Sequence, residues 1–69
     1  MHDLDDCKEG FTTFDNNAEH TPISGSYGLC LCYNYANVWL WQIAMLTGNA
    51  KVYTRRSING NAWTDWVEV

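Results

Sequence analysis

Cysteine and histidine side chains could give this chain metal or nucleophile chemistry. Cys30 and Cys32 stand two residues apart, so on a strand both thiols would point to one face and could share a metal with Cys7 or His20. Zinc-binding pairs usually have the spacing C-x₂₋₄-C, and the sequence has no second pair. Nothing in the sequence orients His20 as the base of a cysteine nucleophile. We therefore expect three reduced, metal-free thiols that pack in the interior.

Carboxylates form a second set near the N-terminus: Asp3, Asp5, Asp6 and Glu9. Oxygen ligands suit a hard cation, but calcium needs about six or more of them in a shaped loop, and the EF-hand spacing is absent. Acidic residues are also favoured in the first turn of a helix, where the helix dipole attracts negative charge. We therefore expect one acidic helical turn or an irregular lead-in, with Leu4 as its apolar anchor and no metal.

Motifs of the common enzyme classes are missing from the sequence. It contains no G-x-S-x-G, H-E-x-x-H or P-loop pattern. Asp65 has no partner carboxylate at a spacing that suits glycoside hydrolysis. We predict a protein that is not an enzyme, with no catalytic residue and no cofactor.

Aromatic and arginine side chains form a third set, which suits saccharide recognition. Sugars stack on aromatic faces and accept hydrogen bonds from Arg, Asn and Gln. The chain has 4 Trp and 4 Tyr, and Trp39 and Trp41 are among them. The predicted ligand-binding residues are Gln42, Tyr53, Arg55, Arg56, Trp63 and Trp66. The alternative is that the tryptophans form the core of a small sheet. An exposed Trp beside Arg55 or Arg56 would favour recognition over a purely structural role.

Length and charge limit the remaining classes. A chain of 69 residues forms one domain at most, which we place at residues 1–69. The net charge is −4, with 4 Lys and Arg against 8 Asp and Glu, which argues against nucleic acid and against an anionic membrane surface as partners. No stretch approaches about 20 apolar residues. These features predict a soluble protein made in a reducing cytoplasm.

Short alternating stretches separated by turn residues predict an all-β fold, an antiparallel meander of about four or five strands. A long polar loop over residues 15–26 holds the only proline, Pro22. Asn59-Gly60 is the strongest hairpin signal, and residues 34–37 and 47–49 are further turns. The expected strands cover residues 11–14, 27–33, 38–46, 50–57 and 66–69.

The stretch Val38–Leu46 has two apolar faces, one with Leu40 and Gln42 and the other with Trp39 and Trp41. We expect a central strand that is covered on each side. A helix is the competing interpretation, but the β-branched and aromatic bias and the flanking turns favour a strand.

We expect a core in which a few residues are buried together. They are Leu29, Leu31, Leu40, Tyr53 and one of Trp63 or Trp66.

The order of motifs along the chain resembles the C-terminal head modules of phage tail fibres, of the pyocin knob type. The shared pattern has an acidic entry, a Gly-aromatic strand, a polar loop with Pro, two apolar strands, a Tyr-x-Arg strand and a Trp-x-x-Trp ending. The matching residues are Asp3-Leu4-Asp5, Gly10-Phe11, Pro22, Gly28-Leu29, Gln42, Tyr53-Thr54-Arg55, Gly60, and Trp63 with Trp66.

This resemblance implies a non-catalytic module of a virion tail fibre, made in the bacterial cytoplasm and often part of a homotrimer. Its expected partner is a bacterial surface glycan or another receptor. The alternative is a structural cap or trimerisation module of a fibre with no ligand of its own.

Overall fold

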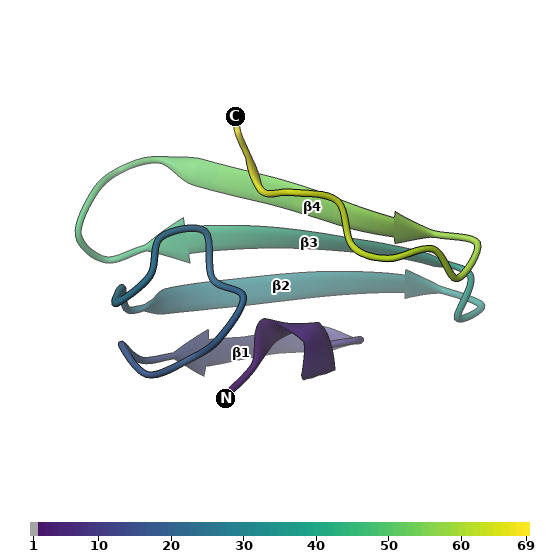
Figure 1. The fold of residues 1–69 in the computed structure, drawn as a ribbon, viewed down its shortest axis with the longest axis horizontal. Helices are drawn as coiled ribbons and strands as arrows, with labels where there is room; N and C mark the ends of the chain where they lie inside the picture. Colours follow the sequence, from purple (N-terminus) through teal and green to yellow (C-terminus); the bar gives the residue numbers. More distant parts are fainter. Residues whose placement is uncertain (1) are drawn as a thin grey trace.

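A computed structural model describes residues 2–69 and shows one five-stranded antiparallel sheet, so the predicted all-β meander is confirmed. The strands lie side by side in chain order (Figure 1). The 3₁₀ turn η1 (Leu4–Asp6) precedes them. The strands are β1 (Gly10–Phe14), β2 (Gly28–Tyr35), β3 (Trp39–Leu46), β4 (Val52–Ile58) and β5 (Val67–Glu68). Over this described range, no helix has the length and apolar character needed to span a membrane.

Two tight turns at one end of the sheet fix the strand register. Ala36 and Asn37 have φ of 53° and 61°, and Val38 N–H donates to the Tyr35 carbonyl at 3.0 Å. Asn59 and Gly60 have φ of 55° and 78°, and Asn61 N–H donates to the Ile58 carbonyl at 3.1 Å. Two consecutive residues with positive φ give the turn whose twist matches that of antiparallel strands. Both predicted turns are therefore confirmed.

Irregular segments cover one face of the sheet. In Figure 1, η1, the loop 15–27 and the C-terminal segment 59–66 all lie in front of the strands. The loop and the N-terminal segment are joined by a parallel bridge between Asp3 and Glu19. The C-terminal segment is bonded to β4 on the side away from β3, where Thr64 N–H donates to the Arg56 carbonyl at 2.9 Å. We call this face of the sheet the covered face and the opposite face the open face.

The apolar core lies between the sheet and these segments. Its buried members are Leu4, Cys7, Phe14, Cys30, Cys32, Leu46 and Tyr53, with Ala18, Trp63 and Trp66 packed against them. The predicted core was right for Tyr53, but wrong for Leu29 and Leu31. Both leucines point to the open face, and Leu31 is exposed. The small thiols alternate with the leucines and fill the narrow space beneath the covering segments instead.

One expectation about the long strand was also wrong. β3 is a central strand, as predicted, but the chain covers only one of its faces. On the uncovered face of β3, Trp39 is 41% exposed and Trp41 is 38% exposed. Antiparallel sheets that face water usually carry polar residues on that side. The open face of this sheet is apolar instead, so it has the composition of a contact surface.

Candidate functional site

Four rows of side chains cross the open face, because the strand register places outward-pointing residues of neighbouring strands side by side. The first row is Tyr35, Trp39 and Ile58, and the second is Tyr33, Trp41 and Arg56. The third is Phe11, Leu31, Ile43, Thr54 and Val67, and the fourth is Thr13, Leu29, Met45 and Val52. The first two rows are aromatic and the last two mainly aliphatic, so the open face has two chemically different halves.

Aromatic rings of the first two rows pack on one another and remain exposed. Tyr33 and Trp41 stack with ring centroids 5.7 Å apart, and Tyr35 and Trp39 stack at 5.1 Å. Trp39 meets Trp41 edge to face at 6.2 Å. These separations are within the favourable range for aromatic pairs. Trp39 is also held by a hydrogen bond of 3.2 Å from its Nε1 to Asn59 Oδ1. The result is a fixed platform of flat rings that the core does not use.

A hollow of about 550 Å³ lies between this platform and the C-terminal segment. Polar groups from the turn and the segment face the rings across it. Its lining residues are Trp39, Trp41, Arg56, Ile58, Asn59, Asn61 and Thr64. A second hollow of about 530 Å³ adjoins it along the strands and shares Trp41, Arg56 and Thr64. Apolar walls with a few polar groups at this volume are typical of small-molecule sites.

A buried polar cluster on the covered face holds the covering segments to the sheet. Gln42 is 0% exposed and donates from Nε2 to the carbonyls of Leu4 at 2.6 Å and Cys7 at 2.7 Å. Its Oε1 accepts a hydrogen bond of 2.7 Å from Arg55 Nε. The Arg55 guanidinium lies between the rings of Trp63 and Trp66, 4.4 and 4.6 Å from their centroids. Cation–π contact of this kind stabilises a desolvated arginine.

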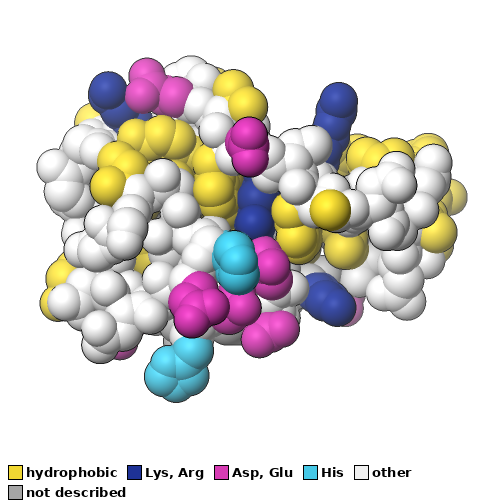
Figure 2. Space-filling view, viewed as in Figure 1, with side chains coloured by type: hydrophobic (Ala, Val, Ile, Leu, Met, Phe, Trp, Pro, Cys, Tyr) yellow, Lys and Arg dark blue, Asp and Glu magenta, His cyan; other side chains and the backbone are white. Residues whose placement is uncertain are grey.

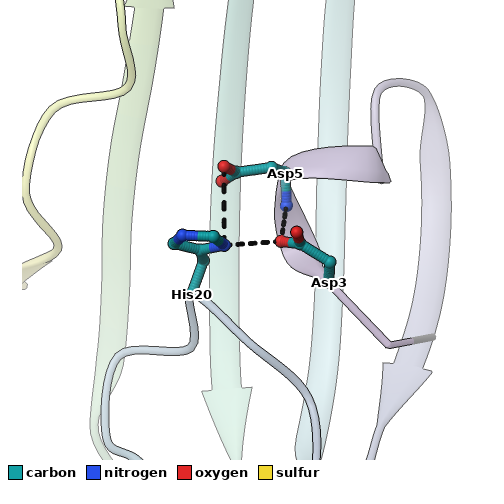
Figure 3. Close-up of side chains that lie close together, drawn as sticks. All are labelled: Asp3, Asp5 and His20. Carbon is teal, nitrogen blue, oxygen red and sulfur yellow. Dashed lines mark hydrogen bonds and ion pairs between the residues drawn. The ribbon is translucent and has the colours of Figure 1, made fainter.

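Acidic groups and a histidine lie at the outer end of this cluster (Figure 3). His20 Nδ1 is 2.6 Å from Asp3 Oδ1 and 3.5 Å from Asp5 Oδ2. Asp3 also caps η1, because its Oδ1 accepts from Asp5 N–H at 2.9 Å. Arg55 Nη2 lies 2.9 Å from Asp5 Oδ1, as an ion pair that lacks hydrogen-bond geometry. The predicted acidic first turn with Leu4 as a buried anchor is confirmed.

These contacts shift the titration of two groups in opposite directions. The hydrogen bond to Asp3, followed by the charges of both aspartates, raises the pKa of His20 above its ordinary value despite some desolvation. Burial alone would raise the pKa of Asp3, but the hydrogen bonds from His20 and Asp5 and the nearby positive charges lower it on balance. The charged forms of both groups are therefore favoured together.

Asp3, Asp5 and His20 also have the donor types of a metal site, with ligand atoms within 4.8 Å of one another. Each donor, however, already has a protein partner. The Arg55 guanidinium is close to Asp5 and would repel a divalent cation. The cluster is therefore best described as an ionic contact between η1, the loop and β4.

The three thiols are packed side by side in the core, as their sequence suggested. Within the described residues 2–69, Cys7, Cys30 and Cys32 are all unpaired and buried. Burial, then the nearby Cys7 thiol, raises the pKa of Cys30 to about 12. The same causes raise the pKa of Cys32 to about 11. Thiols that stay protonated at neutral pH are weak nucleophiles and weak metal ligands.

The predicted binding residues are divided between the two faces. Gln42, Tyr53, Arg55, Trp63 and Trp66 lie together on the covered face, and their contacts there are internal.

Of the predicted binding residues, Arg56 alone lies on the open face, because consecutive residues of β4 point to opposite faces of the sheet. Its cross-strand neighbour is Trp41. This places an exposed tryptophan beside an arginine, the arrangement that would favour recognition.

Sequence reasoning counted Trp39 and Trp41 in the aromatic set but left them out of the predicted ligand-binding residues. It did not consider five further residues at the rings and the hollow of the open face, namely Tyr33, Tyr35, Asn59, Asn61 and Thr64. Alternation along residues 38–46 placed Trp39 and Trp41 opposite Gln42, which would have been a sufficient signal. No sequence pattern indicated that Thr64 lines the hollow, because its position depends on the path of an irregular segment along β4.

Comparison with protein families gives a match over almost the whole chain. Residues 4–68 match the model described as the phage-like element PBSX protein XkdV 3rd domain. The search of curated proteins found no significant match, and neither did the search of solved structures. The family match confirms the phage-related part of the resemblance, and it is not specific to the knob type of tail fibre.

Proposed function

The chain belongs to the family of the third domain of the phage-like element PBSX protein XkdV, and from this premise we propose that it is a non-catalytic recognition module of a phage-like particle. In this proposal the module is part of a tail fibre and binds a bacterial surface receptor, namely a glycan. The binding site is the aromatic half of the open face rather than the buried cluster around Arg55.

One observation carries this proposal: two fixed tryptophans are exposed beside a free arginine. Trp39 and Trp41 are oriented by ring stacking and by the Asn59 hydrogen bond, although they seal no core. Apolar rings exposed without a packing role are a cost to solubility unless a partner covers them. The rings offer stacking surfaces for sugar faces, and Arg56, Asn59 and Asn61 add groups that can bond to hydroxyls.

A single shallow site of this kind is expected to bind weakly, on the order of 0.1–1 mM. Assembly as a homotrimer in a fibre would raise the effective affinity without new contacts, because the second and third sites bind intramolecularly. The proposal therefore includes a trimeric fibre context, with the protein made in the bacterial cytoplasm and used in the virion.

The test compares a trimeric fusion with the monomer for binding to cells of candidate hosts. The trimer should bind and the monomer should bind far less. Replacing both Trp39 and Trp41 with alanine should abolish trimer binding without unfolding the domain, because these rings lie outside the core. The matched control is Phe11→Ala, which removes an exposed ring from the other half of the same face. Equal, negligible binding by monomer and trimer would contradict the proposal.

A structural cap or trimerisation role is the second candidate, and the aliphatic half of the open face favours it. Phe11 is 74% exposed, and it continues into Leu31 and Ile43 across neighbouring strands. This half has no charged side chain, so it suits a protein surface better than a sugar. In that role Phe11→Ala would weaken trimer assembly, measured by mass in solution, while the tryptophan replacements would not.

A further inference from the structure

Arg56 is the one charged residue that lines the hollow beside Trp39 and Trp41. Its backbone is fixed, since its N–H donates to Thr64 Oγ1 at 3.0 Å and its carbonyl accepts from Thr64 N–H. Its guanidinium is exposed and, within the described residues 2–69, forms no ion pair. The hollow therefore contains a positive charge that the protein itself leaves uncompensated.

Among the described residues 2–69, no acidic side chain lines the hollow or forms an ion pair with Arg56. No outward position of β1 to β4 holds Asp or Glu. Figure 2 shows the covered face, where acidic side chains gather around a histidine. The domain measures 17 Å along its shortest axis, and charges are largely screened beyond about 8 Å at physiological salt. A chain with net charge −4 thus presents a locally positive hollow on its open face.

The positive charge in the hollow favours an acidic saccharide over a neutral one. A neutral sugar would use the rings and the amides of Asn59 and Asn61, but it would leave the guanidinium without a matching group. An acidic group on the sugar would pair with Arg56, whose planar fork accommodates carboxylate and phosphate oxygens. A nucleic acid is a poorer match, because its binding depends on several phosphate contacts and the hollow offers one cation.

Building on the proposed function, we infer that this hollow is a subsite for an acidic saccharide unit, with the sugar ring against Trp39 and Trp41 and its anionic group at Arg56. The carboxylate of a uronic acid and a sugar phosphate share this chemistry. The second hollow adjoins the first at Trp41 and Arg56, so neighbouring units of the same glycan can continue along the strands.

The experiment is a titration of the full 69-residue chain, labelled with ¹⁵N, that follows the indole signals of Trp39 and Trp41. The probes are trigalacturonic acid beside its methyl ester, and glucose 6-phosphate beside glucose. Within a pair the acidic member should bind about threefold to fivefold more tightly at about 20 mM salt. This preference should shrink at about 200 mM salt. The two pairs separate a carboxylate source from a phosphate source.

Variants assign the preference to a residue. Arg56→Gln should lower the affinity for the acidic probe to that of its neutral partner and leave the neutral affinity unchanged. Arg56→Lys should retain part of the preference, because it keeps the charge but not the fork. Lys8→Gln is the matched control, since it removes one positive charge from an exposed residue that lines neither hollow and should change neither affinity.

Four results would overturn the inference, and the first three of them separate it from the proposed function. Equal affinity for acidic and neutral probes at the tryptophans would remove the charge preference and leave glycan recognition standing. An equal loss of affinity for the acidic and the neutral probe in Arg56→Gln would show that Arg56 does not act through its charge. If no probe moves the indole signals while the trimer still binds cells, the subsite is absent and the receptor is of another kind. Loss of cell binding as well would overturn both proposals.

Discussion

At the scale of single residues, Gln42 is the side chain on which the covered face depends most. It is fully buried and uses both ends of its amide, toward the carbonyls of Leu4 and Cys7 and toward Arg55 Nε. Removing it would leave the buried Cys7 carbonyl and part of a buried guanidinium without partners, and the Leu4 carbonyl with the Cys7 N–H alone. Such groups are costly because water cannot replace the lost hydrogen bonds.

Gln42→Leu is therefore expected to lower the free energy of unfolding by about 3 kcal/mol or more, although the side-chain volume is nearly kept. Thr54→Val, a polar-to-apolar change on the neighbouring strand with no buried partner, should stay within about 0.5 kcal/mol. Urea denaturation of the two variants measures both values. A similar, small effect of both replacements would show that the buried amide is not needed.

His20 gives the stability of the domain a dependence on pH. Its pKa is raised above 6.5 in the folded state, so its contribution is complete below about pH 6.5 and is lost as the pH rises through the folded value. The pKa of Asp3 is lowered below 3.8, so its contribution is present above about pH 3.8 and is lost as the pH falls through the folded value. Together the two groups favour the folded state most between these limits.

We expect a higher thermal midpoint at about pH 5.5 than at about pH 8.5. His20→Asn should remove much of this difference, and asparagine tolerates the positive φ of 61° at this position. The exposed His2 provides the control, since His2→Asn should preserve the difference. Identical pH profiles for wild type and His20→Asn would rule out the ion pair as the cause.

At the scale of elements, the close packing of β1, β2 and β3 at one end of the sheet depends on Gly28. A Cβ at Gly28 would collide with the Met45 carbonyl oxygen on β3 and lie 2.8 Å from the Phe14 ring. The backbone at this contact cannot move without breaking the ladder between β2 and β3. Gly28 is thus required for close approach rather than for an unusual backbone angle.

Gly28→Ala should destabilise the domain by about 1–3 kcal/mol through overpacking. Gly48→Ala provides a matched control, because a Cβ there meets nothing within 4 Å and φ is not positive. Thermal unfolding of the two variants should show a large fall for the first and almost none for the second. A fall of equal size in both would point to loss of glycine flexibility instead of collision.

Sequence reasoning found the strands and turns because their signals are local. Alternation along each strand and the Asn59-Gly60 turn specify the meander without knowledge of its partners. The same alternation does not say which face the rest of the chain will cover. Leu29 and Leu31 were therefore placed in the core, although the thiols of Cys30 and Cys32 occupy it. The buried Gln42–Arg55 contact likewise depends on where η1 docks, which no local pattern encodes.

At the scale of the whole molecule, the domain is a single sheet with one covered face and one open face. On the covered face, the buried polar cluster holds the irregular segments against the sheet. The open face has the larger exposed rings, with Tyr33 62% exposed. This division allows one strand, β3, to serve stability through Gln42 and Ala44 and, in the proposed function, recognition through Trp39 and Trp41.

The central claim is that the aromatic half of the open face is where this phage-related domain binds a glycan. The most direct measurement is a glycan array probed with the trimeric fusion, with Trp41→Ala and Phe11→Ala trimers read in parallel. We expect the wild type and Phe11→Ala to bind the same set of glycans, and Trp41→Ala to lose that set while staying folded. Binding that survives in Trp41→Ala but disappears in Phe11→Ala would contradict the claim and favour the aliphatic half as the functional surface.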